Sequence, residues 1–146
     1  MKIAIITHHF PPEINGTAIR AYETLRKVIS ANKEAKIFIV APPPSRPFGT
    51  FRRKYYVYRR KIIGSINILR IWTYQPINKN PSFIERFLNY LIFPLIGLPL
   101  ILSLILITDI IMLIIPPTPI SLVSLIAKFL NKKIILDITD LWHEEA

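Results

Sequence analysis

An uncharged run of twenty-two residues constrains the fold of this chain more than any other feature. The run extends from Phe87 to Thr108 and consists almost wholly of apolar side chains. Its length is sufficient for a helix that spans a lipid bilayer. Pro94, Gly97 and Pro99 interrupt it, although membrane helices tolerate both proline and glycine. The segment must therefore either cross a membrane or find a protein surface that covers it.

Strands are predicted on both sides of this run. Short apolar segments rich in β-branched residues are typical of strands buried on both faces of a parallel sheet. Such segments are Lys2–Thr7, Ala35–Ala41, Ile66–Trp72, Asp109–Ile115 and Lys133–Ile138. Helices are expected at about 17–31 and 119–130. Strands that alternate with helices predict βαβ units, and hence a Rossmann-like α/β fold whose parallel sheet has helices on both faces.

The predicted sheet bears on the path of the uncharged run. If the run crossed a bilayer, the last two strands would lie on the opposite side from the first three and could not pair with them. We therefore expect an apolar, membrane-associated helix that docks on the sheet and presents part of its surface to lipid. A true span or a re-entrant element is the alternative.

Composition limits the class of protein. At 146 residues and 16.9 kDa, residues 1–146 are expected to form one domain. Apolar residues make up 51% of the chain and charged residues 19%. This composition excludes a disordered segment, and it is more apolar than that of a typical soluble domain. The chain has no cysteine, so disulfides, thiolate zinc sites and cysteine nucleophiles are excluded. Since the N-terminus lacks a signal-peptide pattern, we expect a cytoplasmic protein, peripheral or monotopic at the inner face of the cell membrane.

The positive charge is concentrated in one part of the chain. The formal net charge is +10, and residues 35–84 hold ten basic and no acidic side chains, while the rest of the chain carries nine of each. Residues 51–61 interleave aromatic with basic residues, and the basic ones are Arg52, Arg53, Lys54, Arg59, Arg60 and Lys61. Such a segment suits an anionic membrane surface or an anionic lipid-linked substrate. A solvated loop and a single-stranded nucleic acid site are the other interpretations, but no RNA-binding module signature accompanies the segment, so no nucleic-acid partner is expected.

A long connection is predicted between the second and third strands. Residues 42–64 begin with three prolines and are too many for a tight turn in a compact domain. We expect this connection to be irregular and either functional or mobile.

The first predicted strand leads into a candidate binding loop. Asn15, Gly16 and Thr17 stand at the start of the first helix, where free backbone N–H groups attract phosphate and a glycine allows close approach. The loop follows the carboxyl end of a strand, which is where open α/β sheets bind their ligands. A turn without a ligand is the alternative. His9 and Glu13, in the same loop, are candidate cleft residues.

Other polar residues offer less specific chemistry, and none is singled out as catalytic. His8 and His9 are adjacent, so in extended backbone they point to opposite sides, and no shared metal ion is expected. One of them could instead donate a hydrogen bond to a sugar or a phosphate. A polar cluster at the C-terminal end of the last strand consists of Asp137, Asp140, Trp142, His143, Glu144 and Glu145. Paired carboxylates there suit acid–base work, and the alternative is that Asp140 caps a turn while the two glutamates are solvated.

Four stretches taken together resemble one family. They are FPPEINGTAIRAYETLRKVI at 10–29, RFLNYLIF at 86–93, DIIMLIIPPTPISLVSLIAKFL at 109–130 and ILDITDLWHEE at 135–145. Their order and spacing are similar to those of the retaining GT-B glycosyltransferases of family 4. The matching features there are the first loop and helix, the helix before the fourth strand, the Pro-Pro turn, and an Asp-x-x-Asp-Leu-Trp motif.

The resemblance implies the N-terminal, acceptor-binding half of a GT-B fold. The enzyme would move a sugar from a nucleotide-sugar, its co-substrate, to a lipid-linked or polysaccharide acceptor, with no further cofactor. By the same resemblance, Asn15, Gly16 and Thr17 would approach the donor phosphates and the acceptor, and Asp140 and Trp142 would lie near the cleft. The family's C-terminal donor-binding domain is absent from these residues, so we expect this chain to transfer nothing alone. It is expected to be either a truncated product or one chain of a split enzyme, whose partner would be a separate C-terminal-domain chain.

A second hypothesis belongs to another class of protein. In it the chain is a non-catalytic membrane-surface module, and the basic loop and the apolar helix hold a partner at anionic lipid. Binding to lipid without any recognition of a sugar acceptor would distinguish this hypothesis from the first.

Overall fold

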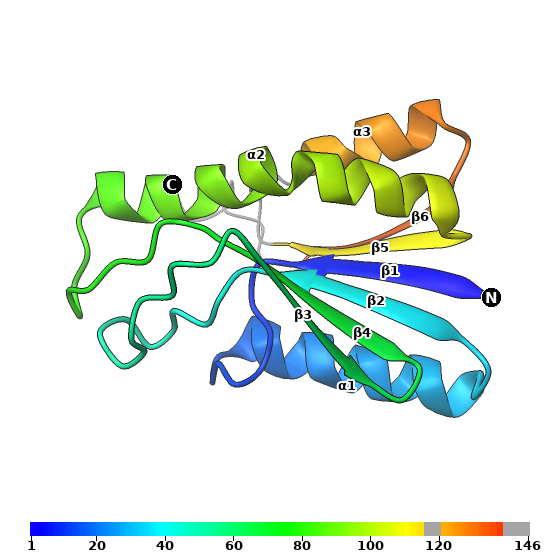
Figure 1. Ribbon diagram of the computed structural model, residues 1–146, viewed down its shortest axis with the longest axis horizontal. Coiled ribbons are helices and arrows are strands. Elements are labelled where there is room, and N and C mark those ends of the chain that lie inside the picture. The colour runs from blue at the N-terminus through cyan, green and yellow to red at the C-terminus, as the bar shows by residue number, and fades with distance from the viewer. Residues whose placement is uncertain (116–120, 139–146) are drawn as a thin grey trace.

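Within residues 1–115 and 121–138, which the computed structural model describes, six strands form one sheet and three helices cover it (Figure 1). The order of the strands is β3-β4-β2-β1-β5-β6. β3 is antiparallel to β4, and all other neighbours are parallel. The strands are β1 (Lys2–Thr7), β2 (Lys36–Ala41), β3 (Tyr58–Ile63), β4 (Ile66–Ile71), β5 (Ile110–Ile115) and β6 (Lys133–Ile138).

Helices cover both faces of the sheet, as predicted. α1 (Gly16–Ala31) lies on one face, and α2 (Phe83–Ile107) and α3 (Leu122–Phe129) lie on the other (Figure 1). The α/β class and the mostly parallel sheet are therefore confirmed. α3 is shorter than the helix expected at 119–130, of which residues 119 and 120 lie outside the described part of the chain.

Alternate residues of the central strands point into two separate cores. In β1, Ile5 packs in the core on the α1 side, which includes Leu25, whereas Ile6 packs in the core on the other side, which includes Phe93 and Ala127. Both isoleucines are fully buried. Burial on both faces explains why these strands are continuous apolar runs in the sequence.

The uncharged run forms most of α2 and lies on the sheet. Asn89, Phe93, Gly97 and Ile101 follow one another at intervals of four residues, and all are buried. Gly97 allows close approach, since a Cβ atom there would stand 3.0 Å from Cδ1 of Ile71 in β4. β5, which follows the helix, pairs with β1, which precedes it. The chain thus returns to the same sheet, as the docked arrangement requires.

α2 begins at Phe83, before the uncharged run. Ser82 and Glu85 form a capping box, in which Oγ of Ser82 accepts from the backbone N–H of Glu85 and the Glu85 carboxylate accepts from that of Ser82, at 3.3 and 2.8 Å. The predicted start at Phe87 was therefore too late. The uncharged part of the sequence corresponds to the part of the helix that packs on the sheet, whereas the capping box at Ser82 and Glu85 determines where the helix begins.

The outward face of α2 is also apolar, and it is exposed. Ile84, Phe87, Leu95, Leu98 and Leu106 lie along one side of the helix and are 36–67% exposed. On the neighbouring α3, the exposed apolar side chains are Leu122, Leu125 and Phe129. α2 is long and apolar enough to cross a membrane, with a mean hydropathy of 2.6 in its most apolar window, of which 33% is buried.

The prediction of an irregular connection over residues 42–64 was wrong at its end. Residues 58–63 form β3, which pairs with β4 through a turn at Gly64, where φ is +56°. All six residues of β3 are exposed. An edge strand that is exposed on both faces needs no alternation of apolar and polar residues, and therefore lacks the pattern by which strands are recognised.

Two substitutions on α2 test which of its faces is buried. Phe93→Ala removes a fully buried ring, whereas Leu95→Ala removes a side chain that is 61% exposed. We expect Phe93→Ala to lower the free energy of unfolding by about 3–5 kcal/mol, and Leu95→Ala to change it by less than about 0.5 kcal/mol. Urea unfolding followed by circular dichroism measures both. An equal loss from Leu95→Ala would mean that the outward face is covered in the isolated protein.

Candidate functional site

Polar side chains gather at the edge of the sheet where the parallel strands end. Because β1, β2 and β4 are parallel neighbours, their carboxyl ends meet there. The polar residues that follow these strands are His8, His9, Ser45, Arg46, Thr73 and Tyr74. Most of them are buried, so this edge is a packed polar layer rather than a set of free loops.

Glu13 organises two of these loops. Its Oε2 accepts from Nδ1 of His9 at 2.7 Å, and its Oε1 accepts from the backbone N–H and Oγ of Ser45 and from the backbone N–H of Arg46. Burial alone would raise the pKa of Glu13. The hydrogen bond and charge of His9 and the two backbone donors outweigh burial and hold that pKa below its ordinary value. The carboxylate is therefore ionised, and His9 carries its proton on Nδ1.

His8 belongs to a second network, which reaches α2. Its Nε2 lies 2.8 Å from Oδ1 of Asn89, whose Nδ2 donates to the carbonyl oxygen of Tyr74 at 2.6 Å. Burial, the largest cause, and the charges of His9 and Arg46 lower the pKa of His8 to about 3. The ring is thus neutral, with its proton on Nε2 and a lone pair on Nδ1.

Two polar atoms of this network are buried without a partner in the described part of the chain. They are Nδ1 of His8, an acceptor, and Nε of Arg46, a donor. Tyr90 joins the two residues, because its ring centroid is 4.4 Å from that of His8 and its hydroxyl accepts from Nη2 of Arg46 at 3.1 Å. An acceptor and a donor in one cluster suit a hydroxyl group, which can serve both.

The two histidines serve separate networks. Their ring centroids are 5.0 Å apart, with the rings at 81° to one another. His9 faces Glu13 while His8 faces Asn89. Over residues 1–115 and 121–138, no three His, Cys, Asp or Glu side chains converge in a way that could hold a metal ion.

The predicted binding loop lies at the start of α1. Oδ1 of Asn15 accepts from the backbone N–H of Ala18 at 2.8 Å and so caps the helix. Gly16 borders open space, since a Cβ atom there would meet nothing within 4 Å. Thr17 is the second residue of the helix. The helix start is therefore fixed in place, with room beside Gly16 for another molecule.

Asp137 is engaged in an ion pair and is not free for acid–base work. Arg20 of α1 donates to both its carboxylate oxygens, from Nε at 2.8 Å and from Nη2 at 2.5 Å. The pair joins α1 to the carboxyl end of β6. Asp140 and Trp142, the other candidates of this segment, lie outside the described residues.

The predicted basic segment is divided between a loop and a strand. Gln75, which is 5% exposed, fixes the loop, because its side-chain amide exchanges two hydrogen bonds of 3.0 Å with the backbone of Lys54. Nε of Arg53 donates to the carbonyl oxygen of Gln75 at 2.8 Å, and its guanidinium lies over the ring of Tyr74. The remaining basic residues, on the edge strand β3, are Arg59, Arg60 and Lys61.

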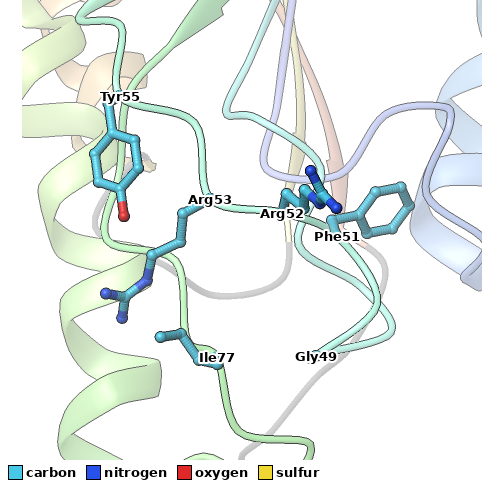
Figure 2. A pocket seen from close by; sticks show the side chains of 6 residues that line it. All are labelled: Gly49, Phe51, Arg52, Arg53, Tyr55 and Ile77. Carbon is cyan, nitrogen blue, oxygen red and sulfur yellow. The ribbon is translucent and has the colours of Figure 1, made fainter.

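A pocket of about 460 Å³ lies beside this loop (Figure 2). In the view, Arg53 reaches toward the space between Tyr55 and Ile77, while Phe51 and Arg52 lie on the other side. Its lining residues are Gly49, Phe51, Arg52, Arg53, Tyr55 and Ile77. Two of the predicted basic residues thus border a concavity.

Several residues of this site were missed in the sequence. The most important are Ser45, Arg46, Arg70, Gln75, Asn89 and Tyr90. Arg70 also links loops, since its guanidinium donates to the carbonyl oxygens of Pro42 and Pro11. Asn89 offered a usable signal, because a polar residue early in a long apolar helix needs a buried partner.

Comparison with known proteins identifies no relative, since no protein-family model and no curated protein matches the chain.

The low pKa of His8 predicts a loss of stability in acid. In the unfolded chain His8 binds a proton below about pH 6.5, whereas in the folded protein it does so only near pH 3. The contribution of neutral His8 to the free energy of unfolding is therefore present above pH 6.5 and is lost as the pH falls. Between pH 6.5 and about 5, above the range in which Glu13 contributes, we expect the free energy of unfolding to fall less steeply in His8→Gln than in the unchanged protein. Urea unfolding at several pH values measures this. Parallel curves would contradict a neutral His8.

Proposed function

We propose that this chain is the N-terminal, acceptor-binding domain of a membrane-associated GT-B glycosyltransferase of the family 4 type, with a Rossmann-like sheet. Three features support the proposal. The parallel strands gather a polar layer at their carboxyl ends, the start of α1 borders open space at Gly16, and the four motifs follow the family in order. The observation that carries it is the position of Gly16 at the same edge as the network of Glu13.

The site would bind rather than activate its ligands. The first backbone N–H groups of α1 and its dipole favour a phosphate of the nucleotide-sugar. In the proposal, Asp140 and Trp142 border the cleft, and a donor-binding domain completes the enzyme.

A bulky side chain at position 16 tests the proposal. Gly16→Leu should fold normally, because its Cβ atom meets nothing within 4 Å, but it would fill the space that a ligand needs. Binding is measured by surface plasmon resonance with nanodiscs that contain polyprenyl-diphosphate-linked monosaccharides, against nanodiscs that contain the same amount of polyprenyl diphosphate without a sugar. The preference is the ratio of the affinities for the discs with and without the sugar. We expect Gly16→Leu to reduce this ratio at least about tenfold, which corresponds to about 1.4 kcal/mol of binding free energy.

The control places the same side chain elsewhere on α1. Ser30→Leu, an exposed position near the other end of the helix, should leave the preference unchanged. If the unchanged protein shows no preference for any sugar-bearing disc, the glycosyltransferase proposal fails.

The second candidate is a non-catalytic membrane-surface module, and the outward faces of α2 and α3 favour it. Most of the exposed side chains of these two helices are aliphatic or aromatic, the exceptions being Arg86, Ser103 and Lys128, and α2 carries no charge after Arg86. A surface of this kind can lie in the interface of a bilayer, and the net charge of +10 favours anionic lipid. Membrane association is common to both candidates, and only sugar recognition separates them.

A matched pair of substitutions tests membrane association. Leu95 and Leu106 on α2 are 61% and 64% exposed, and Ile19 on α1, on the opposite face of the sheet, is 56% exposed. In flotation with phosphatidylglycerol vesicles, the Leu95→Ser/Leu106→Ser double variant should bind at least about tenfold more weakly, because about 1.5–3 kcal/mol is associated with each large apolar side chain removed from water. Ile19→Ser should float like the unchanged protein. Equal effects would place the membrane contact elsewhere.

A further inference from the structure

The pocket beside the basic loop is not used by the function proposed above. Arg52 and Arg53 line it, and the stem of Lys79 lies near its floor, since a Cβ atom at Gly49 would stand 3.1 Å from Cγ of Lys79. No acidic residue occurs between positions 35 and 84. Glu85 is the neighbouring carboxylate, and it is held by the capping box and by the hydroxyl of Tyr74. The pocket is thus a concave surface with an excess of positive charge.

The two arginines differ in a way that suits recognition of an anion. The side chain of Arg53 is held at Nε by the carbonyl oxygen of Gln75 and lies over the ring of Tyr74, 5.3 Å from its centroid, which fixes its orientation. Arg52 has no hydrogen bond or ion pair from its side chain within the described part of the chain. One guanidinium is therefore oriented in advance and the other is available to close on a ligand.

The rest of the pocket is apolar and partly open to solvent. Phe51, Tyr55 and Ile77 complete the lining, and Tyr55 and Ile77 are 82% and 61% exposed. A bare inorganic ion would leave these side chains without contact. A ligand with an anionic head and an apolar part would use both halves of the lining.

We propose that this pocket binds the phosphate group of an amphiphilic ligand, with Arg52 and Arg53 on the phosphate and Tyr55 and Ile77 on the apolar part. The inference rests on the proposed function only in identifying this phosphate with that of a lipid-linked acceptor. The chemistry recognised is a phosphate ester, and its source is either a lipid in the membrane or a soluble phosphate.

The test compares arginines that border the pocket with one that does not. Co-sedimentation is measured with phosphatidylcholine vesicles that contain polyprenyl phosphate, and with phosphatidylcholine alone. Arg52→Gln and Arg53→Gln should each weaken binding to the polyprenyl phosphate vesicles by at least about tenfold, because each removes charge-assisted hydrogen bonds. Arg59→Gln, which removes the same charge from the exposed strand β3, should change binding by less than about twofold.

The outcomes identify the source of the phosphate. Calorimetry with hexyl phosphate, a soluble phosphate ester with an apolar chain, gives the soluble arm, and binding there with the same dependence on Arg52 and Arg53 supports the pocket as a site for a soluble amphiphilic phosphate. Binding to the vesicles alone supports a lipid. An equal loss from Arg59→Gln overturns the proposal in favour of diffuse charge. Displacement by a single-stranded RNA oligonucleotide that binds more tightly than either phosphate ligand overturns it in favour of nucleic acid.

Substitutions at two glycines test the shape of the pocket without changing its charge. Gly49 and Gly64 both have positive φ, +79° and +56°, so an alanine is strained at either position. At Gly49 the added Cβ atom would also lie 3.0 Å from the carbonyl oxygen of Ile77, in the pocket wall, whereas at Gly64 it meets nothing within 4 Å. Gly49→Ala should therefore reduce binding to polyprenyl phosphate vesicles by at least about fivefold and Gly64→Ala should not, with circular dichroism to confirm that both variants fold. Equal binding by the two would overturn the assignment of the site to this pocket.

The test of the sugar site is independent of this one. Gly16→Leu should leave the binding of polyprenyl phosphate vesicles unchanged, since Gly16 is not among the residues that line the pocket. If the unchanged protein binds polyprenyl phosphate vesicles but shows no preference for sugar-bearing discs, the proposed function fails and the pocket proposal stands. If it shows the sugar preference but Arg52→Gln and Arg53→Gln leave vesicle binding unchanged, the pocket proposal fails alone.

Discussion

The packing of α2 on the sheet is the constraint on which the rest of the structure depends. Phe93 and Ile101 are fully buried there, and Gly97 brings the helix backbone close to Ile71. Because the helix stays on the sheet, β5 can pair with β1 and β6 can pair with β5. On this face of the sheet, side chains of α2 join residues of β1, β4 and β5 in one core, and so connect the two halves of the chain.

The same helix links the apolar core to the polar edge. The side chain of Asn89 donates to the carbonyl oxygen of Tyr74 and fixes the tautomer of His8, so a residue of α2 determines which ring nitrogen of this histidine carries the proton. Glu13 performs a similar role for the loops after β1 and β2. The edge is thus organised by two buried polar groups, each of which draws its partners from elements distant in sequence.

The sequence was sufficient to predict the α/β class, five of the six strands and the position of α1, because burial on both faces produces apolar runs that are visible without a structure. It was insufficient for β3, whose exposed residues carry no such pattern. It was also insufficient for the partners within the site. The pairing of Glu13 with Ser45 and Arg46 joins residues more than thirty positions apart, and no local periodicity encodes it.

The basic segment shows that the sequence can identify residue types correctly and still not show which of them lie together in the fold. Its six cations form two runs of three, separated by residues 55–58, and were predicted as one surface. In the structure Arg59 and Lys61 lie on strand β3, while Gln75 holds Lys54 in the loop. Gln75 lies on the far side of β4 in the chain, and its pairing depends on the fold as a whole. The sequence pattern identified a group of basic and aromatic residues, but their positions in space are determined by the tertiary structure.

The positive charges of β3 also oppose pairing between this exposed edge strand and a strand of another molecule. An open sheet ends in a row of unpaired backbone donors and acceptors that can recruit a strand from another molecule. Arg59, Arg60 and Lys61 occupy consecutive positions of that border strand and point to both of its sides. A second copy that approached it would meet like charge on either side, so self-assembly into fibrils or aggregates is opposed at this border.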